Sequence, residues 1–142
     1  LGRINIAARG AGMAKGATNM ALHYAMDRKT FGKAIAEHQA IQLKLAEMST
    51  RAAAAELLVH QAADKFDRHE RCDLEAGHAK FFASEAAVQN SLDAMRVFGG
   101  YSYSPEYEIE RFYRDAPLLC IGEGTNEIQR MIIAKQMVAR AS

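Results

Sequence analysis

The stretch HQAIQLKLAEMSTRAAAAELLVHQAADKFDRH, residues 38–69, decides the fold that the sequence predicts. Its apolar side chains follow one another at steps of four and three residues, a spacing that places them on one face of an α-helix. This stripe consists of Ile41, Leu45, Met48, Ala52, Ala55, Val59, Ala62 and Phe66. It predicts one helix of about eight turns.

Apolar residues recur in the same way on both sides of this stretch. Two further stripes consist of Ile6, Gly10, Met13, Ala17, Met20 and Tyr24 upstream, and of Phe81, Val88, Leu92 and Met95 downstream. Ile128, Met131 and Ile132 mark a last helix, and a shorter one is expected over residues 105–115, with Pro105 in its first turn. Breaks fall at residues 30–34, 69–73, 98–105 and 115–124. Long helices with short connections predict an all-α fold, an antiparallel four-helix bundle with a short extra helix.

The composition limits the kinds of partner that the chain is expected to have. Its 142 residues suit one domain, and 49% of them are apolar, which is enough for a sizeable core. The formal net charge is +1 with both signs mixed along the chain, whereas a nucleic-acid-binding face needs clustered basic residues. No apolar run reaches the roughly 18 residues of a membrane span. We therefore expect neither a nucleic acid nor a membrane among its partners.

The cysteines and the N-terminal residues bear on where the chain works. Cys72 and Cys120 fit no disulfide framework and no CxxC site, which favours a reducing compartment. The start, LGRINIAARG, has neither an initiator Met nor the apolar core of a signal peptide. We expect the chain to be processed or to be cut from a longer polypeptide.

Two motifs resemble ligand sites but favour a structural interpretation. GAGMAKG, residues 10–16, has the spacing G-x-G-x-x-x-G inside a predicted helix, whereas a dinucleotide fingerprint needs G-x-G-x-x-G at a strand-to-helix turn. We interpret this stretch as a close helix–helix crossing. EAGH, residues 75–78, is a single E-x-x-H motif, and a di-iron bundle needs two such motifs and two further glutamates. No metal site is predicted, and a ferritin-like metal bundle stays an alternative that metal analysis tests.

The stretch DRKTFGKAIAEHQ, residues 27–39, places several ligand-binding groups at one end of the bundle. They are the guanidinium of Arg28, the hydroxyl of Thr30, the ring of Phe31 and the amide of Gln39. Such a set can hold a phosphate and a planar ring. The simpler interpretation is that Arg28 only completes a helix C-terminus, where a cation is favourable.

The segment VFGGYSYSPEY, residues 97–107, contains a glycine pair, Gly99 and Gly100. A double glycine can form a plain turn. It can also let the backbone approach a bulky ligand closely, since no Cβ intrudes.

The segment CIGEGTNEIQR, residues 120–130, carries a lone acid, Glu123, between two glycines. Thr125 is a good N-cap for the helix that follows, and an ordinary helix start explains Thr125 and Gly124. An ordinary helix start does not explain Gly122. A carboxylate left unshielded by glycines beside a helix N-terminus suits a general base, and the backbone N–H groups of the corner can polarise a substrate carbonyl.

Four motifs of the chain occur together in the order and spacing of one known family. They are RKTFG (28–32) with Gln39 downstream, FGGY (98–101), RFYRDA (111–116) and EGTNEIQR (123–130). Over essentially its whole length the chain resembles the C-terminal domain of the acyl-CoA dehydrogenases. The resemblance implies an FAD-dependent enzyme that removes two hydrogens from an acyl-CoA thioester to give trans-2-enoyl-CoA. A glutamate takes the α-proton in that family, and the flavin N5 accepts the β-hydrogen as hydride.

The resemblance also implies roles for individual residues. Glu123 matches the base, and Gly124 matches a position that contacts the thioester region. Thr125 and Glu127 match positions that touch the FAD of the same subunit, and Arg3 matches an arginine that lies near the acyl-CoA. The positions that reach the FAD of a neighbouring subunit are matched by Arg28, Thr30, Phe31, Gln39, Gly99 and Gly100.

The chain departs from the family's usual pattern at a few positions. One subgroup carries its base on the first bundle helix, where this chain has Gly2, so Glu123 is the candidate here. Arg96 stands where a glutamine usually precedes the glycine pair, and Ser102 stands where a third glycine usually follows. Gly122 stands where many members have a tyrosine, and it leaves more room beside the acyl chain.

The resemblance implies partners as well. We expect a homodimer or homotetramer, acyl-CoA as substrate and an electron-transfer flavoprotein as electron acceptor, in the bacterial cytoplasm or the mitochondrial matrix. The N-terminal helical and middle β-domains of the family have no counterpart in residues 1–142. We therefore treat the chain as a single C-terminal bundle domain that alone retains no FAD and is inactive. An acyl-CoA oxidase domain and a stand-alone, non-catalytic helical oligomerisation module stay alternatives.

Overall fold

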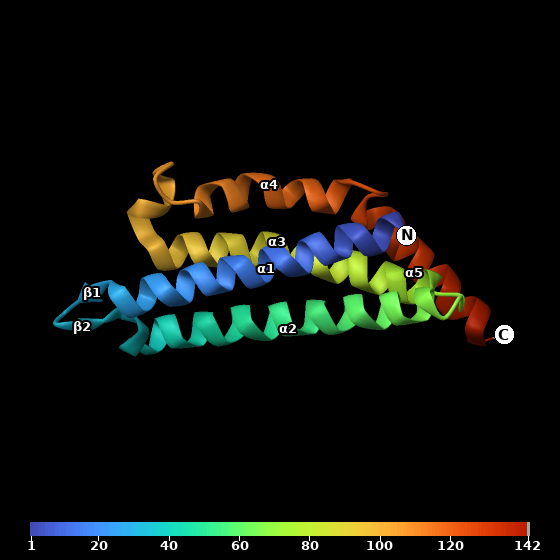
Figure 1. Cartoon of the computed structure of the whole chain (residues 1–142), viewed down its shortest axis with the longest axis horizontal. Coiled ribbons are helices and arrows are strands. Elements are labelled where there is room, and N and C mark those ends of the chain that lie inside the picture. The colour runs from blue at the N-terminus through green and yellow to red at the C-terminus, as the bar shows by residue number, and fades with distance from the viewer. Residues whose placement is uncertain (142) are drawn as a thin grey trace.

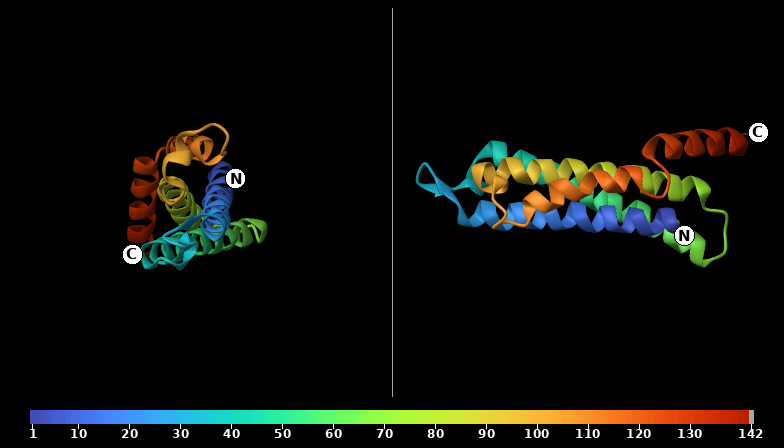
Figure 2. Two further views of the ribbon diagram at one scale, coloured as in Figure 1. Left: turned by 90° about the vertical axis from the view of Figure 1, so that its left-hand side faces the viewer. Right: turned by 90° about the horizontal axis from the view of Figure 1, so that it is seen from above.

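A computed structural model describes residues 1–141 of the chain, which form five α-helices and a small hairpin. The elements are α1 (Gly2–Asp27), β1 (Lys29–Thr30), β2 (Lys33–Ala34), η1 (Ile35–Glu37), α2 (Gln39–Asp67), α3 (Asp73–Phe98), η2 (Gly99–Tyr103), α4 (Ile109–Ile121) and α5 (Asn126–Ala141). Helices α1 to α4 run along the long axis, each antiparallel to the one before it (Figure 1). Helix α5 lies at one end and extends beyond the other helices (Figure 2). The predicted all-α, antiparallel four-helix bundle with an extra helix is confirmed.

Helix α3 lies at the centre, because it packs against all four other helices. Many of its buried residues are small, among them Ala79, Ala83 and Ala87, which are fully buried. Neighbouring backbones therefore approach closely. A Cβ built on Gly10 of α1 would lie 2.7 Å from the carbonyl oxygen of Ala83. The glycine-containing stretch of α1 is thus a close helix crossing, as the sequence predicted.

The stripe that predicted the fold forms α2. Its central members Met48, Ala55 and Ala62 are fully buried, whereas Phe66 in the last turn is exposed. The period of the apolar residues therefore gives this helix correctly.

The short helix lies further along the chain than predicted. Pro105 belongs to a turn, and α4 begins only at Ile109. Ile109, Ala116 and Leu119 are buried at helical spacing, so burial of this face sets the helix position. The helix continues through the exposed Pro117, where it lacks one backbone hydrogen-bond donor. It is the fourth helix of the bundle, and α5 is the extra one.

A hairpin that the sequence does not predict occupies residues 29–34. Strand β1 pairs with β2 in antiparallel register, with Lys29 opposite Ala34. The turn residues Phe31 and Gly32 have φ values of +52° and +81°. Two consecutive left-handed residues match the tight turn that suits a two-residue hairpin loop.

Glu75, at the start of α3, joins three helices. Its carboxylate accepts hydrogen bonds from Lys65 of α2 at 2.7 Å and from Arg140 of α5 at 2.9 and 3.0 Å. The glutamate of the single E-x-x-H motif is thus held in ion pairs. Across residues 1–141, no three His, Cys, Asp or Glu side chains are grouped closely enough to hold a metal ion. Within the same residues, no helix combines the length and the apolarity needed to cross a bilayer.

We expect Glu75 to make the stability of the fold fall at acidic pH. Hydrogen bonds from Arg140 outweigh the effect of burial and lower the pKa of Glu75 from 4.5 to about 2. A carboxylate with a lowered pKa stabilises the fold above pH 4.5 and loses that contribution as the pH falls toward 2. The loss across this window is expected to be about 3 kcal/mol of unfolding free energy.

Denaturant unfolding at several pH values measures this contribution. Glu75→Gln should flatten the pH dependence in the acidic window, whereas Glu106→Gln, at an exposed site, should leave it unchanged. An equally steep fall of stability in Glu75→Gln would contradict the assignment.

Candidate functional site

The residues assigned from the sequence lie in two groups at opposite ends of the bundle (Figure 1). Glu123 and Arg3 lie where α4 meets α5, beside the N-terminus. Arg28 and the glycine pair Gly99–Gly100 lie at the end that carries the β1–β2 hairpin. Arg3 and Arg28 are separated by about 37 Å of helix α1. The candidate residues of one chain therefore form two separate groups.

The corner between α4 and α5 has an unusual backbone. Residues 122–125 connect α4 to α5, and Glu123 and Gly124 both have positive φ, +57° and +88°. A positive φ is uncommon for a residue other than glycine, and such strain gathers at functional sites. The Glu123 side chain is exposed. The lone acid of the sequence is therefore held at a strained, accessible corner.

The side chain of Glu123 lies against the start of α1. A Cβ built on Gly2 would be 2.9 Å from Cδ of Glu123 and closer still to Oε2. Any side chain at position 2 would have to displace this carboxylate. Positions 2 and 123, at which the family resemblance puts a base, are thus neighbours in space. Because residue 2 is glycine, the carboxylate of Glu123 has room there.

A buried polar network lies beneath the corner. Lys80 of α3 is fully buried, and its Nζ donates to the carbonyl of Cys120 at 3.0 Å and to Oδ1 of Asn126 at 2.8 Å. The Asn126 amide donates to Glu85 at 2.7 Å and to Ser84 at 3.0 Å. Burial lowers the pKa of Lys80. These bonds fix the end of α4 and the start of α5 onto α3.

A second contact holds the tip of the corner. The side-chain amide of Gln129 donates to the carbonyl of Glu123 at 3.3 Å and to that of Gly124 at 3.1 Å. The sequence analysis gave no role to Gln129, Asn126 or Lys80. The first two lie within the EGTNEIQR motif, which is the signal that could have indicated them.

Thr125 and Glu127 lie at the start of α5, as predicted. The Thr125 hydroxyl accepts the backbone N–H of Ile128 at 3.5 Å, which is a long capping contact. Glu127 is exposed and accepts from Arg130 at 2.9 Å. Hydrogen bonds from its own backbone amide and then from Thr125 lower the pKa of Glu127.

Arg3, predicted to lie near the acyl-CoA, already has a partner within the chain. Its guanidinium donates to Oδ1 of Asp73 at 2.8 Å, and this bond lowers the pKa of Asp73. The Arg3 side chain stays 27% exposed. Asp73 therefore orients Arg3 and still leaves part of it open to a ligand.

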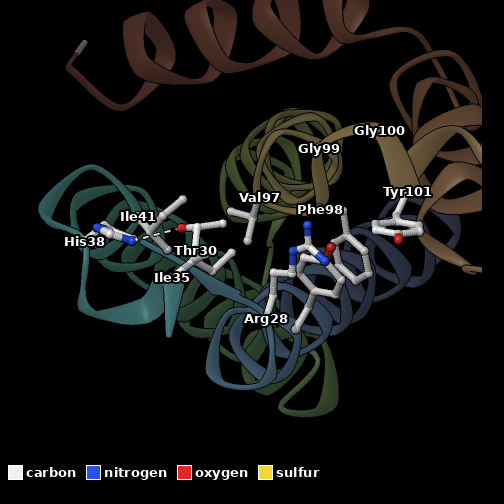
Figure 3. Close-up of a pocket in the computed structure, with 11 residues that line it drawn as sticks. Arg28, Thr30, Ile35, His38, Ile41, Val97, Phe98, Gly99, Gly100 and Tyr101 are labelled. Carbon is white, nitrogen blue, oxygen red and sulfur yellow. Dashed lines mark hydrogen bonds between the residues drawn. The ribbon is translucent and has the colours of Figure 1, made fainter. Parts of the chain in front are cut away.

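A pocket of about 580 Å³ opens at the other end of the bundle (Figure 3). Arg28, Thr30, Gly99 and Gly100 line it, so four predicted residues are brought together. A Cβ built on Gly99 or Gly100 would meet no heavy atom within 4 Å. The remaining lining residues are Tyr24, Ile35, His38, Ile41, Val97, Phe98 and Tyr101.

The polar groups of this pocket have defined neighbours. The Arg28 guanidinium carbon lies 5.6 Å from the ring centroid of Tyr101. The Thr30 hydroxyl lies 3.0 Å from Nε2 of His38, as Figure 3 shows. A cation, a hydroxyl and an aromatic ring thus meet at one cavity, a set suited to a phosphate and a planar ring. His38 and Tyr101 were not assigned from the sequence, although each lies in or beside a motif that was.

Phe31 and Gln39, predicted for the same ligand, do not line the pocket. Phe31 is 96% exposed at the hairpin tip, and Gln39 is exposed at the start of α2. They can meet only a ligand that extends beyond the pocket of this chain.

The two departures near the pocket have structural partners. Arg96 donates to Asp93 at 3.1 Å, and Arg51 donates to the same carboxylate at 2.6 Å. Burial raises the pKa of Asp93, but the hydrogen bonds from Arg51 and Gln89 and the nearby positive charges together outweigh burial, so the pKa lies below its ordinary value. Ser102 donates to the carbonyl of Gly99 at 2.7 Å, which ties the η2 turn together.

The fold and the two groups of residues define a helical-bundle domain with candidate ligand-binding residues at both ends. Residues 1–138 match the family described as acyl-CoA dehydrogenase, C-terminal domain, and the chain belongs to that family. It is 49% identical over 138 residues to a 3-(aryl)acrylate reductase of Clostridium sporogenes, covering 97% of this chain and 37% of that protein. It is 51% identical over 138 residues to an acyl-CoA dehydrogenase of Bacillus subtilis, covering 97% and 36%.

Solved structures agree with this assignment. The butyryl-CoA dehydrogenase of Megasphaera elsdenii superimposes with a TM-score of 0.94 at 39% identity, covering 96% of this chain and 36% of that one. The chain therefore spans little more than a third of the length of these relatives.

Proposed function

We propose that the chain is the C-terminal catalytic and oligomerisation domain of an FAD-dependent acyl-CoA dehydrogenase. The observation that carries the proposal is the corner at Glu123. A non-glycine residue is held there in a left-handed conformation between two glycines, and its exposed carboxylate lies over Gly2 at the start of α1. This arrangement suits a general base that meets its substrate from one side.

In the proposed reaction, the Glu123 carboxylate takes the α-proton of an acyl-CoA thioester. The β-hydrogen leaves with its electron pair as hydride, and the bond between the two carbons becomes a trans double bond. Bound FAD would supply the acceptor for this hydride, and an electron-transfer flavoprotein is proposed to receive the electrons afterwards. The backbone N–H groups of the corner polarise the thioester carbonyl, and Arg3 is placed beside the acyl-CoA.

The residues at both ends of the bundle fit FAD. At the pocket, Arg28 supplies a cation for phosphate, and Gly99 and Gly100 leave open space for a ligand. At the corner, Thr125 and Glu127 lie beside the proposed base. Because the two groups are separated by about 37 Å of helix, we propose that each FAD contacts two chains of a homodimer or homotetramer.

Exposed apolar side chains support association with a further chain or domain. They include Leu43 and Leu57 of α2 and Met131 and Met137 of α5. Cys72 and Cys120 are free thiols, which suits the reducing compartment, such as a bacterial cytoplasm, in which we place the protein.

For the acyl group we propose a branched or ring-bearing one. A Cβ built on Gly122 would lie 3.4 Å from its nearest neighbour, the carbonyl oxygen of Leu118. The backbone there has φ −65°, which any residue can adopt, so glycine is not required by the conformation. We propose that a bulky acyl group lies where a side chain at position 122 would otherwise stand, next to Glu123 in the chain.

The proposal is tested on the full-length protein that contains this chain. Anaerobic addition of an acyl-CoA is expected to bleach the oxidised flavin and to yield the trans-2-enoyl-CoA, identified by mass spectrometry. Butyryl-CoA, isovaleryl-CoA and 3-phenylpropionyl-CoA form the panel, and the two bulky substrates are expected to react faster. The chain alone serves as the control and should be colourless. A flavin that stays oxidised with every acyl-CoA would contradict the function.

A further inference from the structure

We propose that Gln129 is the positioning residue of the Glu123 corner, because its side-chain amide keeps Glu123 in its left-handed conformation. The kinetic part of this inference rests on the proposed function, whereas the structural part does not. Gln129 lies on α5 one turn beyond the corner and is only 1% exposed. Its Nε2 donates to both carbonyls at the tip, those of Glu123 and Gly124.

Gly124, the residue after Glu123, leaves room for the side-chain amide of Gln129. A Cβ built on Gly124 would lie 2.9 Å from Nε2 of Gln129, so a side chain there would push the amide away. Gly124 thus has two reasons to be glycine, its φ of +88° and the close approach of Gln129.

The amide of Gln129 is poorly explained as a part of the core. Its Oε1 is buried and has no hydrogen-bond partner among the residues that the structure describes, which destabilises the fold. An apolar side chain of similar volume would fill the same space without that penalty. The two carbonyls that it holds belong to exposed residues, so water could satisfy them. What the amide adds is therefore a fixed geometry at the tip.

The other hydrogen bonds near the corner hold its two ends and not its tip at Glu123 and Gly124. Lys80 and Asn126 fix the residues on either side, since Lys80 donates to the Cys120 carbonyl and to the Asn126 side chain. Neither reaches the carbonyls of Glu123 or Gly124. Across residues 1–141, Gln129 is the one side chain that donates to them. Without its amide, the strained residue Glu123 is expected to sample other backbone conformations.

The test is Gln129→Met in the full-length flavoprotein, since Met keeps the volume and lacks the donor. We expect amide hydrogen exchange to accelerate in peptides covering residues 119–128, while the melting temperature stays the same or rises. The kcat is expected to fall by about tenfold to a hundredfold, because small displacements of a catalytic group cost that much, while the KM for the acyl-CoA changes little. Gln129→Leu, which has a similar volume and no hydrogen-bond donor, should show the same losses.

Gln136→Met is the matched control. Gln136 is a buried glutamine of the same helix and makes no contact with the corner, so both exchange and kcat should stay at their original values. Unchanged exchange at residues 119–128 in both Gln129 variants would overturn the inference, and so would faster exchange with an unchanged kcat. If Glu123→Gln left the enzyme active, the proposed function would fail, whereas the exchange result would still decide whether Gln129 holds the corner.

Discussion

Glu123→Gln is expected to slow flavin reduction by acyl-CoA in the full-length protein by more than about 10³-fold. Glutamine keeps the shape and hydrogen-bonding capacity of the side chain but cannot accept the α-proton. The nearest alternative position for a base is Gly2, which packs against the Glu123 carboxylate and carries no side chain. Within residues 1–141, the alternative position therefore offers no group that could substitute for the missing base.

The FAD content and the binding of acyl-CoA are expected to survive this substitution, because the residues proposed to hold both ligands are unchanged. Anaerobic stopped-flow reduction of the two proteins side by side measures the effect. Glu47→Gln, on the exposed surface of α2, is the control and should reduce its flavin at the original rate. A Glu123→Gln protein that reduces flavin within about tenfold of the original would show a barrier change of only about 1.4 kcal/mol. Glu123 would then be a helix-start residue and not the base.

The sequence predicts the helices of this fold well wherever one face is apolar over many turns. Met48, Ala55 and Ala62 are spaced so that only a helix buries them together, and α2 ends within two residues of the predicted limits. The predicted position of the short helix, residues 105–115, is wrong because Pro105 alone suits a first turn, whereas burial of Ile109 decides where α4 begins. At such a helix end, tertiary packing overrides the local conformational preferences of the residues.

The candidate site could be predicted in part. Glu123 stands out because two glycines flank it, and this signal is local in the sequence. The side chains that hold the corner could not be predicted in this way, since Lys80 comes from another helix, 43 residues before Glu123 in the numbering. Lys80 is buried only because α4 and α5 close over it. Periodicity alone gives no reason to place a lysine in a core.

The largest effect on folding is expected for Gly10→Val, which should lower the unfolding free energy by about 4 kcal/mol or more. A Cβ at position 10 would lie 2.7 Å from the carbonyl oxygen and 2.8 Å from the carbonyl carbon of Ala83. These are backbone atoms of the central helix α3, and they cannot rotate away as a side chain can. The whole of α1 would have to move off α3, which would open the core along the main interface of the bundle.

Gly12→Val is the matched control for this prediction, on the same helix and two residues away. A Cβ at Gly12 would meet no heavy atom within 4 Å, and the residue is exposed. Glycine is a poorer helix former than valine, so this variant should be unchanged in stability or more stable by up to about 0.5 kcal/mol. Denaturant unfolding followed by far-ultraviolet circular dichroism compares the two variants. Equal stabilities would mean that α1 and α3 do not cross closely at Gly10, because only a backbone approach at that position distinguishes the two glycines.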